Sequence, residues 1–237
     1  MKQRDQLARV DLIGKGIEIG AFHTPWPLPD GSSVEFVDTR DRAALLKILD
    51  AEYDVFPRHK DAVPETDHIC AAETLDLIGP ATQDFVLASH VLEHCFDPLM
   101  ALRNWLRVLK PGGHILMAVP EAENWLDKNR EVTSLDFLKR IYRERDPEAR
   151  RGYKAQQFRE YFIIVEQLSG ERLEQEISLA IEDGADVHFN VWSHQTYHPF
   201  LQAAEELLPE LHHIETFVNG AEFLTVLKKQ IRKGNTK

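Results

Sequence analysis

Titratable side chains gather in two short stretches of this 237-residue chain. The first, "SHVLEHCFDP", holds His90, Glu93 and His94 at spacings of three and four residues, which place them on one side of a helical turn. Imidazole exchanges a proton near neutral pH, so such groups suit acid–base chemistry. The second stretch, "DVHFNVWSHQTYHPF", mixes aromatic and titratable residues in the manner of a ligand pocket: Asp186, His188, Trp192, His194, Tyr197 and His198.

We predict that His90, His94 and His188 are the catalytic residues. Each stretch also has a purely structural interpretation. Glu93 and His94 can simply brace the start of a helix, and residues 187–191 can form a short strand with His188 on its polar face. Arg130 likewise either pairs with an anionic substrate or braces a nearby helix.

The elements that must position these residues follow from hydrophobic periodicity. Helical patterns cover residues 41–53 and 97–110, and the second has Asp97 as N-cap and Pro98 at the first helical position. Strands and helices that alternate predict a mostly parallel sheet covered by helices. The expected strands are the apolar runs at residues 16–21, 34–38, 68–72, 84–90 and 112–120.

The pattern changes after the last of these strands. Residues 121–185 are charged and mostly helical in pattern, and they are too long for an ordinary connection, so we expect an ordered insertion or lid. A helix is expected at 198–211, followed by two strands over 212–229 around the hairpin signal Asn219-Gly220. No linker-like segment divides the chain, which favours one domain over residues 1–237.

Ligands of open parallel sheets bind beyond the carboxyl ends of the strands. Four loops would meet there: "GAFHTP" after Ile19, the acid Asp38, the segment 71–73, and Ser89-His90. A carboxylate at the end of a second strand can accept hydrogen bonds from both ribose hydroxyls, as Asp38 would. The glycines of "GKGIEIGA" do not match the G-x-G-x-x-G spacing of a dinucleotide loop, which argues against NAD.

The runs "IEIGAF", "VEFVD" and "DFVLASHVLEHCFDPLMALRNWLRVLKPGGHILMAVP" resemble class I S-adenosylmethionine-dependent methyltransferases. The resemblance implies an α/β Rossmann-like fold: a mostly parallel seven-stranded sheet with a C-terminal antiparallel hairpin and a helical insertion after strand five. It implies S-adenosyl-L-methionine as cofactor and S-adenosyl-L-homocysteine as product. "KNREVTSLDFLKRIY" and "DVHFNVWSHQTYHPFL" are similar to a bacterial subgroup associated with surface-polysaccharide or secondary-metabolite genes.

The resemblance also implies residue roles. Gly20 would let the backbone approach the methionine part of the cofactor, and Glu18 would organise the turn. Asp38 would hold the ribose, and the Ala72 amide would meet the adenine. Many family members have an acid where this chain has Ala71, so that adenine contact is missing. The other cofactor-binding residues that we expect are Ala21, Phe22 and Ser89.

The order His-x-x-Glu-His is similar to the Glu-x-x-Glu-His ligand set of certain magnesium-dependent methyltransferases, with His90 in place of the first acid. An imidazole there disfavours magnesium, which prefers oxygen ligands. His188 would add a nitrogen ligand suited to a softer metal. From the sequence alone we assign no metal ligand.

The composition limits the classes of substrate and partner that we expect. A formal charge of -11 repels phosphate backbones, so we expect no nucleic acid as partner. Cys70 and Cys95 suit reduced thiols in the cytoplasm, and no apolar run predicts a membrane segment or a signal peptide. We predict O-methylation of a small acceptor, a sugar, a sugar nucleotide or another metabolite, and a homodimer stays open. The alternative is an inactive accessory protein with a methyltransferase fold.

Overall fold

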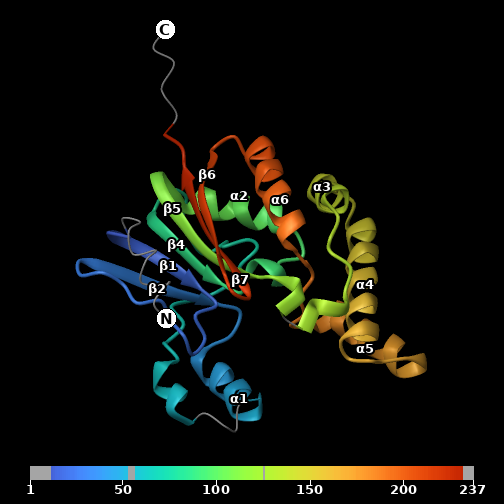
Figure 1. The fold of residues 1–237 in the computed structure, drawn as a ribbon. Helices are drawn as coiled ribbons and strands as arrows, with labels where there is room; N and C mark the ends of the chain where they lie inside the picture. Colours follow the sequence, from blue (N-terminus) through green and yellow to red (C-terminus); the bar gives the residue numbers. More distant parts are fainter. Residues whose placement is uncertain (1–11, 53–56, 125, 232–237) are drawn as a thin grey trace.

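The computed structural model describes residues 12–52, 57–124 and 126–231, and in these residues it has one seven-stranded sheet (Figure 1). The strand order is β3-β2-β1-β4-β5-β7-β6. The first five strands pair in parallel, and β7 pairs antiparallel with both β5 and β6. The predicted fold class is therefore confirmed. The strands are β1 Gly14–Ile19, β2 Ser32–Asp38, β3 His68–Ile69, β4 Gln83–Ser89, β5 Leu109–Pro120, β6 Leu211–Asn219 and β7 Glu222–Lys229.

Helices connect and cover these strands. The α-helices are α1 Arg42–Glu52, α2 Pro98–Val108, α3 Leu135–Arg143, α4 Pro147–Ile164, α5 Gly170–Asp183 and α6 His194–Leu207. Short 3₁₀ turns are η2 Pro57–Ala62, η3 Leu92–His94, η4 Ala122–Asn124 and η5 Leu126–Asn129. The α2 helix begins as predicted, because the Asp97 side chain accepts the Met100 N–H at 3.0 Å and Pro98 needs no partner.

The central strands are buried on both faces, as their apolar runs predicted. In β4, Val86 and Ala88 pack with α2 and α6 in the main core, whereas Phe85 and Leu87 face a second cluster that includes Trp26. A strand with period-two side chains can be apolar throughout only when both sheet faces are covered. This burial fixes the register of β4 and therefore the position of the loop that follows it.

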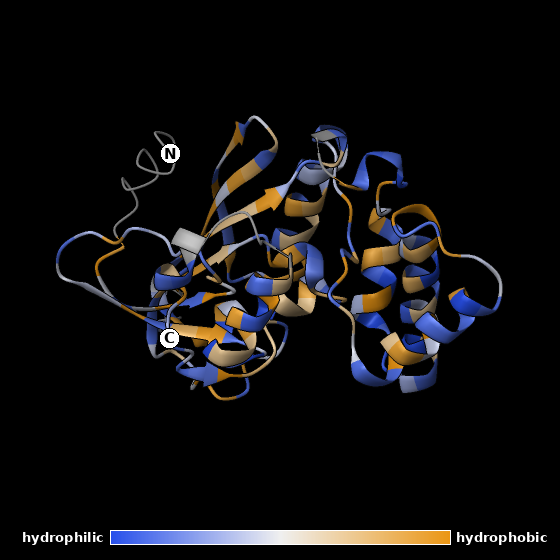
Figure 2. Ribbon diagram, turned by 90° about the horizontal axis from the view of Figure 1, so that it is seen from below, coloured by the Kyte–Doolittle hydropathy of each residue, from blue (hydrophilic) through white to orange (hydrophobic). Residues whose placement is uncertain are grey.

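The predicted insertion forms a helical unit of α3, α4 and α5 beside the sheet (Figure 1). Seen from below, this unit lies to the right of the strands (Figure 2). It has its own apolar cluster, in which Phe158, Leu173 and Ile177 of the helices pack with Phe96 and Phe189 from the neighbouring loops. The insertion is thus anchored through the loop after β4 and the loop before α6. That this insertion acts as a lid over the site stays a prediction.

Several boundaries differ from expectation. The strand considered for residues 187–191 does not form, because the N–H groups of Phe189 and Asn190 bond to the Glu93 carbonyl and not to a neighbouring strand. His188 and Asn190 are buried, as are Val187, Phe189 and Val191. With both sides covered, polar–apolar alternation does not apply to this segment.

The other deviations are shifts of element ends. The α6 helix begins at His194, earlier than predicted, where Ser193 and Thr196 form a capping box. The α2 helix ends at Val108, and β3 has only two residues. The predicted hairpin is confirmed, with Gly220 at φ +63 in its turn. No helix of the described residues is both long and apolar enough to cross a membrane.

Candidate active site

The carboxyl ends of β1, β2, β3 and β4 point to one edge of the sheet, since these strands are parallel. The strand order reverses between β1 and β4, so the switch point lies between the loops that begin at Gly20 and His90. Open α/β sheets bind their ligands at this point. The four loops predicted to form the cofactor site therefore share one edge of the sheet.

The turn after β1 needs glycine at its first position. Gly20 has φ +64, and a Cβ on it would lie 2.9 Å from Val91 Cγ2. The buried Glu18 carboxylate accepts the Trp26 N–H at 3.0 and 3.2 Å, which shows how this acid organises the turn. Ala21 is buried in the turn, and Phe22 has φ +45 and packs against the cluster of α1.

The next two loops supply a carboxylate and an amide. Asp38 ends β2, its Oδ1 accepts the Arg40 N–H at 3.1 Å, and burial raises its pKa. The Ala72 carbonyl accepts the Trp105 indole N–H at 2.8 Å, which fixes the loop after β3. Among the described residues nothing accepts the Ala72 N–H. Ser89 ends β4 opposite Ala118 of β5. Cofactor contacts of these residues stay predictions.

His90 follows β4 in a left-handed conformation, with φ +54. Its Nε2 lies 2.9 Å from Glu222 Oε2, and its Nδ1 lies 3.4 Å from Glu93 Oε1. Burial opposes the charged ring, but the two carboxylates outweigh burial and raise the pKa of His90 to about 9. An imidazole that is protonated at neutral pH cannot accept a proton. The two carboxylates therefore favour the charged ring, and the catalytic role of His90 stays a prediction.

The buried acid Glu93 is the centre of the histidine-rich group. One ligand-type atom from each of Glu93, His94 and His188 lies within 4.8 Å of the others. The rings of His94 and His188 meet edge to face, with centroids 4.7 Å apart. The structure therefore brings together two of the three predicted catalytic histidines, His94 and His188, which lie 94 positions apart in the sequence.

Each of these two histidines has its own acidic partner. His188 Nδ1 lies 2.5 Å from Asp127 Oδ2 of η5, and both residues are buried. His94 Nδ1 lies 2.8 Å from Asp186 Oδ1, which raises the pKa of His94 although burial opposes this change. Burial would raise the pKa of Glu93, but the neighbouring histidines outweigh it and lower that pKa. The group thus favours a charged carboxylate at its centre.

The loop before α6 is bound tightly to η3. The Glu93 carbonyl accepts the N–H groups of Phe189 and Asn190 at 2.8 and 3.1 Å. The Asn190 side chain donates to the Cys95 carbonyl at 2.6 Å, and the Gln157 side chain of α4 donates to the Phe189 carbonyl at 2.7 Å. These bonds hold His188 against Glu93 and join both to the helical insertion.

Arg130 braces this region through hydrogen bonds to groups inside the chain. Its guanidinium donates to Asp127 Oδ1 at 2.8 Å, to the His188 carbonyl at 2.7 Å and to Glu160 Oε2 at 2.9 Å. It also lies over the Tyr161 ring, 5.3 Å from its centroid. The structural interpretation of Arg130 is therefore favoured, because all sides of the fork are used.

The second predicted stretch divides in the structure. Asp186 and His188 join Glu93, whereas Trp192 and Tyr197 lie in the core with α6. The exposed side chains His194 and His198 contact Phe223 and His213 instead. The pocket interpretation of the whole stretch is therefore not supported. Sequence reasoning missed the partners Asp127 and Glu222, and no local spacing signals them.

Two surface hollows lie away from the Glu93 group and from the loops at the switch point. One of about 390 Å³ follows the charged face of α3, and one of about 90 Å³ lies between α3 and α6 beside Trp192. Neither is lined by the loops at the switch point.

The strand order, the antiparallel C-terminal pair and the loops at the switch point together define a Rossmann-like methyltransferase fold. Solved structures support this fold. The partner of the Trm112 methyltransferase activator in a complex from Haloferax volcanii is 14% identical, with 97% of this chain and 89% of that chain covered and a TM-score of 0.51. A protein from Pyrococcus horikoshii is 16% identical, with 95% and 87% covered and a TM-score of 0.50.

The family comparison gives the class of enzyme. Residues 31–117, from the start of β2 into β5, match the model of the methyltransferase domain family. No curated protein sequence matches the chain. This match and the fold support a class I S-adenosylmethionine-dependent methyltransferase, with S-adenosylmethionine as cofactor.

Proposed function

We propose that this methyltransferase transfers the methyl group to a hydroxyl oxygen of a small acceptor, a sugar, a sugar nucleotide or another metabolite. The observation that carries the proposal is the Glu93, His94 and His188 group, in which Glu93 and His94 belong to the loop that follows β4 at the switch point. In the transfer the hydroxyl oxygen attacks the methyl carbon, the carbon–sulfur bond breaks, and S-adenosylhomocysteine keeps the electron pair. The hydroxyl proton must also leave, and imidazoles held by carboxylates can promote this step.

His188 is the strongest candidate for this activation. Its Nδ1 faces Asp127 at 2.5 Å, which leaves Nε2 as the ring nitrogen that can meet an acceptor. His94, paired with Asp186, is the second candidate. The helical insertion would close over the acceptor, since the Asn190 and Gln157 bonds join it to the same loops.

A panel assay tests this function. The protein would be incubated with S-adenosylmethionine and sugar nucleotides, phenols, carboxylic acids and amines, and S-adenosylhomocysteine and methylated products would be measured by mass spectrometry. We expect a methyl ether from a hydroxyl acceptor, and His188→Ala should lower its turnover by about 100-fold. Products methylated only on nitrogen would contradict the proposal.

The accessory-protein alternative has one observation in its favour. Ala71 stands where a related acid would bind the adenine amino group, which weakens one cofactor contact. The activator complex of the Haloferax volcanii relative suggests a partner protein as a further option. Isothermal titration with S-adenosylhomocysteine separates the two functions, because an accessory protein need not bind it.

The proposal also covers the cellular compartment, the partner class and the domain organisation. Free thiols at Cys70 and Cys95 support the reducing cytoplasm as the place of action. The charge of -11 supports a small molecule over nucleic acid. A single domain over residues 1–237 with a lid at 121–185 fits the insertion, and light scattering would test whether the protein forms a homodimer.

A further inference from the structure

The Glu93 carboxylate is in an unusual state for a buried acid. Its side chain is 0% exposed, yet neither Oε1 nor Oε2 has a hydrogen-bond partner among the described residues. Its ion-pair partner in the described residues is His90, whose Nδ1 lies 3.4 Å from Oε1. Burial of a carboxylate without hydrogen bonds is costly, so native proteins complete such groups with a ligand or an ion.

The histidines beside Glu93 are oriented as metal ligands are. His188 Nδ1 lies within hydrogen-bond distance of Asp127, and His94 Nδ1 forms an ion pair with Asp186 at 2.8 Å. A ligating histidine commonly gives one ring nitrogen to a carboxylate, which fixes the ring and leaves the other nitrogen for the metal. Both acids have an arginine nearby, Arg130 at 2.8 Å from Asp127 and Arg40 at 3.9 Å from Asp186. No arginine or lysine pairs with Glu93 in the described part of the chain.

We infer that Glu93, His94 and His188 bind a divalent transition-metal ion, with Asp127 and Asp186 orienting the two imidazoles. Two histidines and one glutamate form a ligand set that zinc uses in catalytic sites. Magnesium is disfavoured, because it requires oxygen ligands in an octahedral arrangement. Ligand atoms of a tetrahedral zinc site lie about 3.3 Å apart, so a group within 4.8 Å closes with small side-chain movements.

A bound ion would have an open position for the acceptor. It would hold the acceptor oxygen at the switch point and lower the pKa of that hydroxyl, whose proton then leaves to water. His188 Nε2 serves either as a ligand or as a proton acceptor, and the ion makes it a ligand. This role rests on the proposed function, whereas metal binding itself does not.

Metal titration of the full chain tests the inference. Protein treated with a chelator and dialysed would be titrated with Zn²⁺ and, separately, with Mg²⁺ by calorimetry. We expect one Zn²⁺ per chain with a Kd below about 10 μM, and Mg²⁺ at least about 100-fold weaker. Co²⁺ bound at the same site would give the visible absorption of a tetrahedral complex, which reports geometry without any activity assay.

Variants locate the site. Glu93→Gln keeps the side-chain shape and the backbone bonds to Phe189 and Asn190, and it should weaken Zn²⁺ binding by at least about 10-fold. Asp127→Asn should weaken it by about 10–100-fold through His188. His198→Ala is the matched control, because His198 is exposed and lies away from the group, and its Zn²⁺ affinity should equal that of the wild type.

Two results would overturn the inference. One is wild-type protein that binds no Zn²⁺ at this affinity. The other is Glu93→Gln protein that folds, as judged by its thermal midpoint, and keeps the wild-type Zn²⁺ affinity. S-adenosylhomocysteine titration separates this failure from failure of the proposed function. Cofactor binding together with hydroxyl methylation, but without zinc, would leave the proposed function standing and remove the metal.

Discussion

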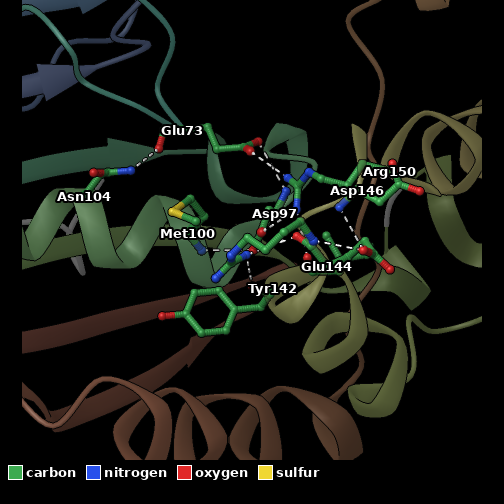
Figure 3. A network of polar contacts seen from close by, with 10 residues as sticks. Glu73, Asp97, Met100, Asn104, Tyr142, Glu144, Asp146 and Arg150 are labelled. Carbon is green, nitrogen blue, oxygen red and sulfur yellow. Dashed lines mark hydrogen bonds and ion pairs between the residues drawn. The ribbon is translucent and has the colours of Figure 1, made fainter. Parts of the chain in front are cut away.

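Two buried acids, Glu93 and Asp97, lie four residues apart in the segment between β4 and α2, and they have different partners. In the network around Arg150, Asp97 accepts the Met100 N–H at 3.0 Å and Arg150 Nη1 at 3.2 Å (Figure 3). Glu73 accepts the Asp97 N–H at 3.2 Å, and Arg150 also donates to the Ile141 carbonyl at 2.8 Å. Glu93, equally buried, has none of these bonds among the described residues.

This difference in hydrogen bonding indicates that Asp97 stabilises the fold and that Glu93 belongs to the candidate site. The Arg150 network joins the loop after β3, the start of α2 and the α3–α4 connection, so it fastens the helical insertion to the sheet (Figure 3). Every element that it joins is held by a hydrogen bond or ion pair inside the chain. The Glu93 group is held by its backbone, and among the described residues its carboxylate has the ion pair with His90 but no hydrogen bond.

The largest effect, a loss of folding stability, is expected when the Arg150 network is broken. Arg150→Ala leaves the Asp97 carboxylate, whose side chain is 0% exposed, without its cation. Loss of one partner from a buried pair costs about 3–5 kcal/mol, and the 25% exposure of the Arg150 side chain lowers our expectation to about 3 kcal/mol. Urea unfolding would measure the change. Arg159→Ala, which removes a surface pair with Glu174, is the control and should leave the free energy of unfolding nearly unchanged.

The second largest effect is expected from a change at Glu93, which should lower enzymatic turnover and leave the stability of the fold almost unchanged. Glu93→Gln should lower turnover by about 100-fold, equivalent to about 2.7 kcal/mol, while the free energy of unfolding of metal-free protein changes by less than about 1 kcal/mol. S-adenosylhomocysteine affinity should stay within about twofold. A large loss of stability with wild-type turnover per folded molecule would mean that Glu93 is another structural acid.

Much of the fold was predictable, because its signals are local. Asp97-Pro98 predicts the start of α2, and Asn219-Gly220 predicts the hairpin turn. The apolar run of β4 predicts a strand that is buried on both faces. The site was predictable only in part. Glu93 and His94 share one turn, but His188 meets Asp127 across 61 residues and His90 meets Glu222 across 132. No periodicity encodes such contacts, and they decide which histidine is charged and which one is oriented.

The third effect lies in the cofactor site, outside both groups. Asp38→Ala should weaken S-adenosylhomocysteine binding by at least about 10-fold, since the ribose hydroxyls would lose their acceptor. Calorimetric titration would measure this affinity, with Asp67→Ala as the control, since Asp67 precedes β3 and accepts the Phe36 N–H. An unchanged affinity would mean that the ribose lies elsewhere. Neither stability nor Zn²⁺ binding should respond, because Asp38 belongs to neither buried group.

The smallest effect is a pH dependence within the Arg150 network. Burial raises the pKa of Asp97 above 3.8 and that of Glu73 above 4.5, although hydrogen bonds and Arg150 oppose the change. For an acid with a raised folded pKa, the stabilising contribution is complete below the unfolded value and is lost as pH rises through the folded value. Removal of Arg150 raises both values further, so Arg150→Ala should cost less at about pH 4 than at pH 7.

Urea unfolding of wild type and variant at both pH values would measure this difference. Arg150→Lys should restore part of the stability at pH 7, because an ammonium group replaces the charge but not the planar fork. A cost of Arg150→Ala that is equal at both pH values would show that the guanidinium acts through its contact with the Phe96 ring and its bond to the Ile141 carbonyl. The network would then be a packing device, and charge compensation would no longer distinguish it from the Glu93 group.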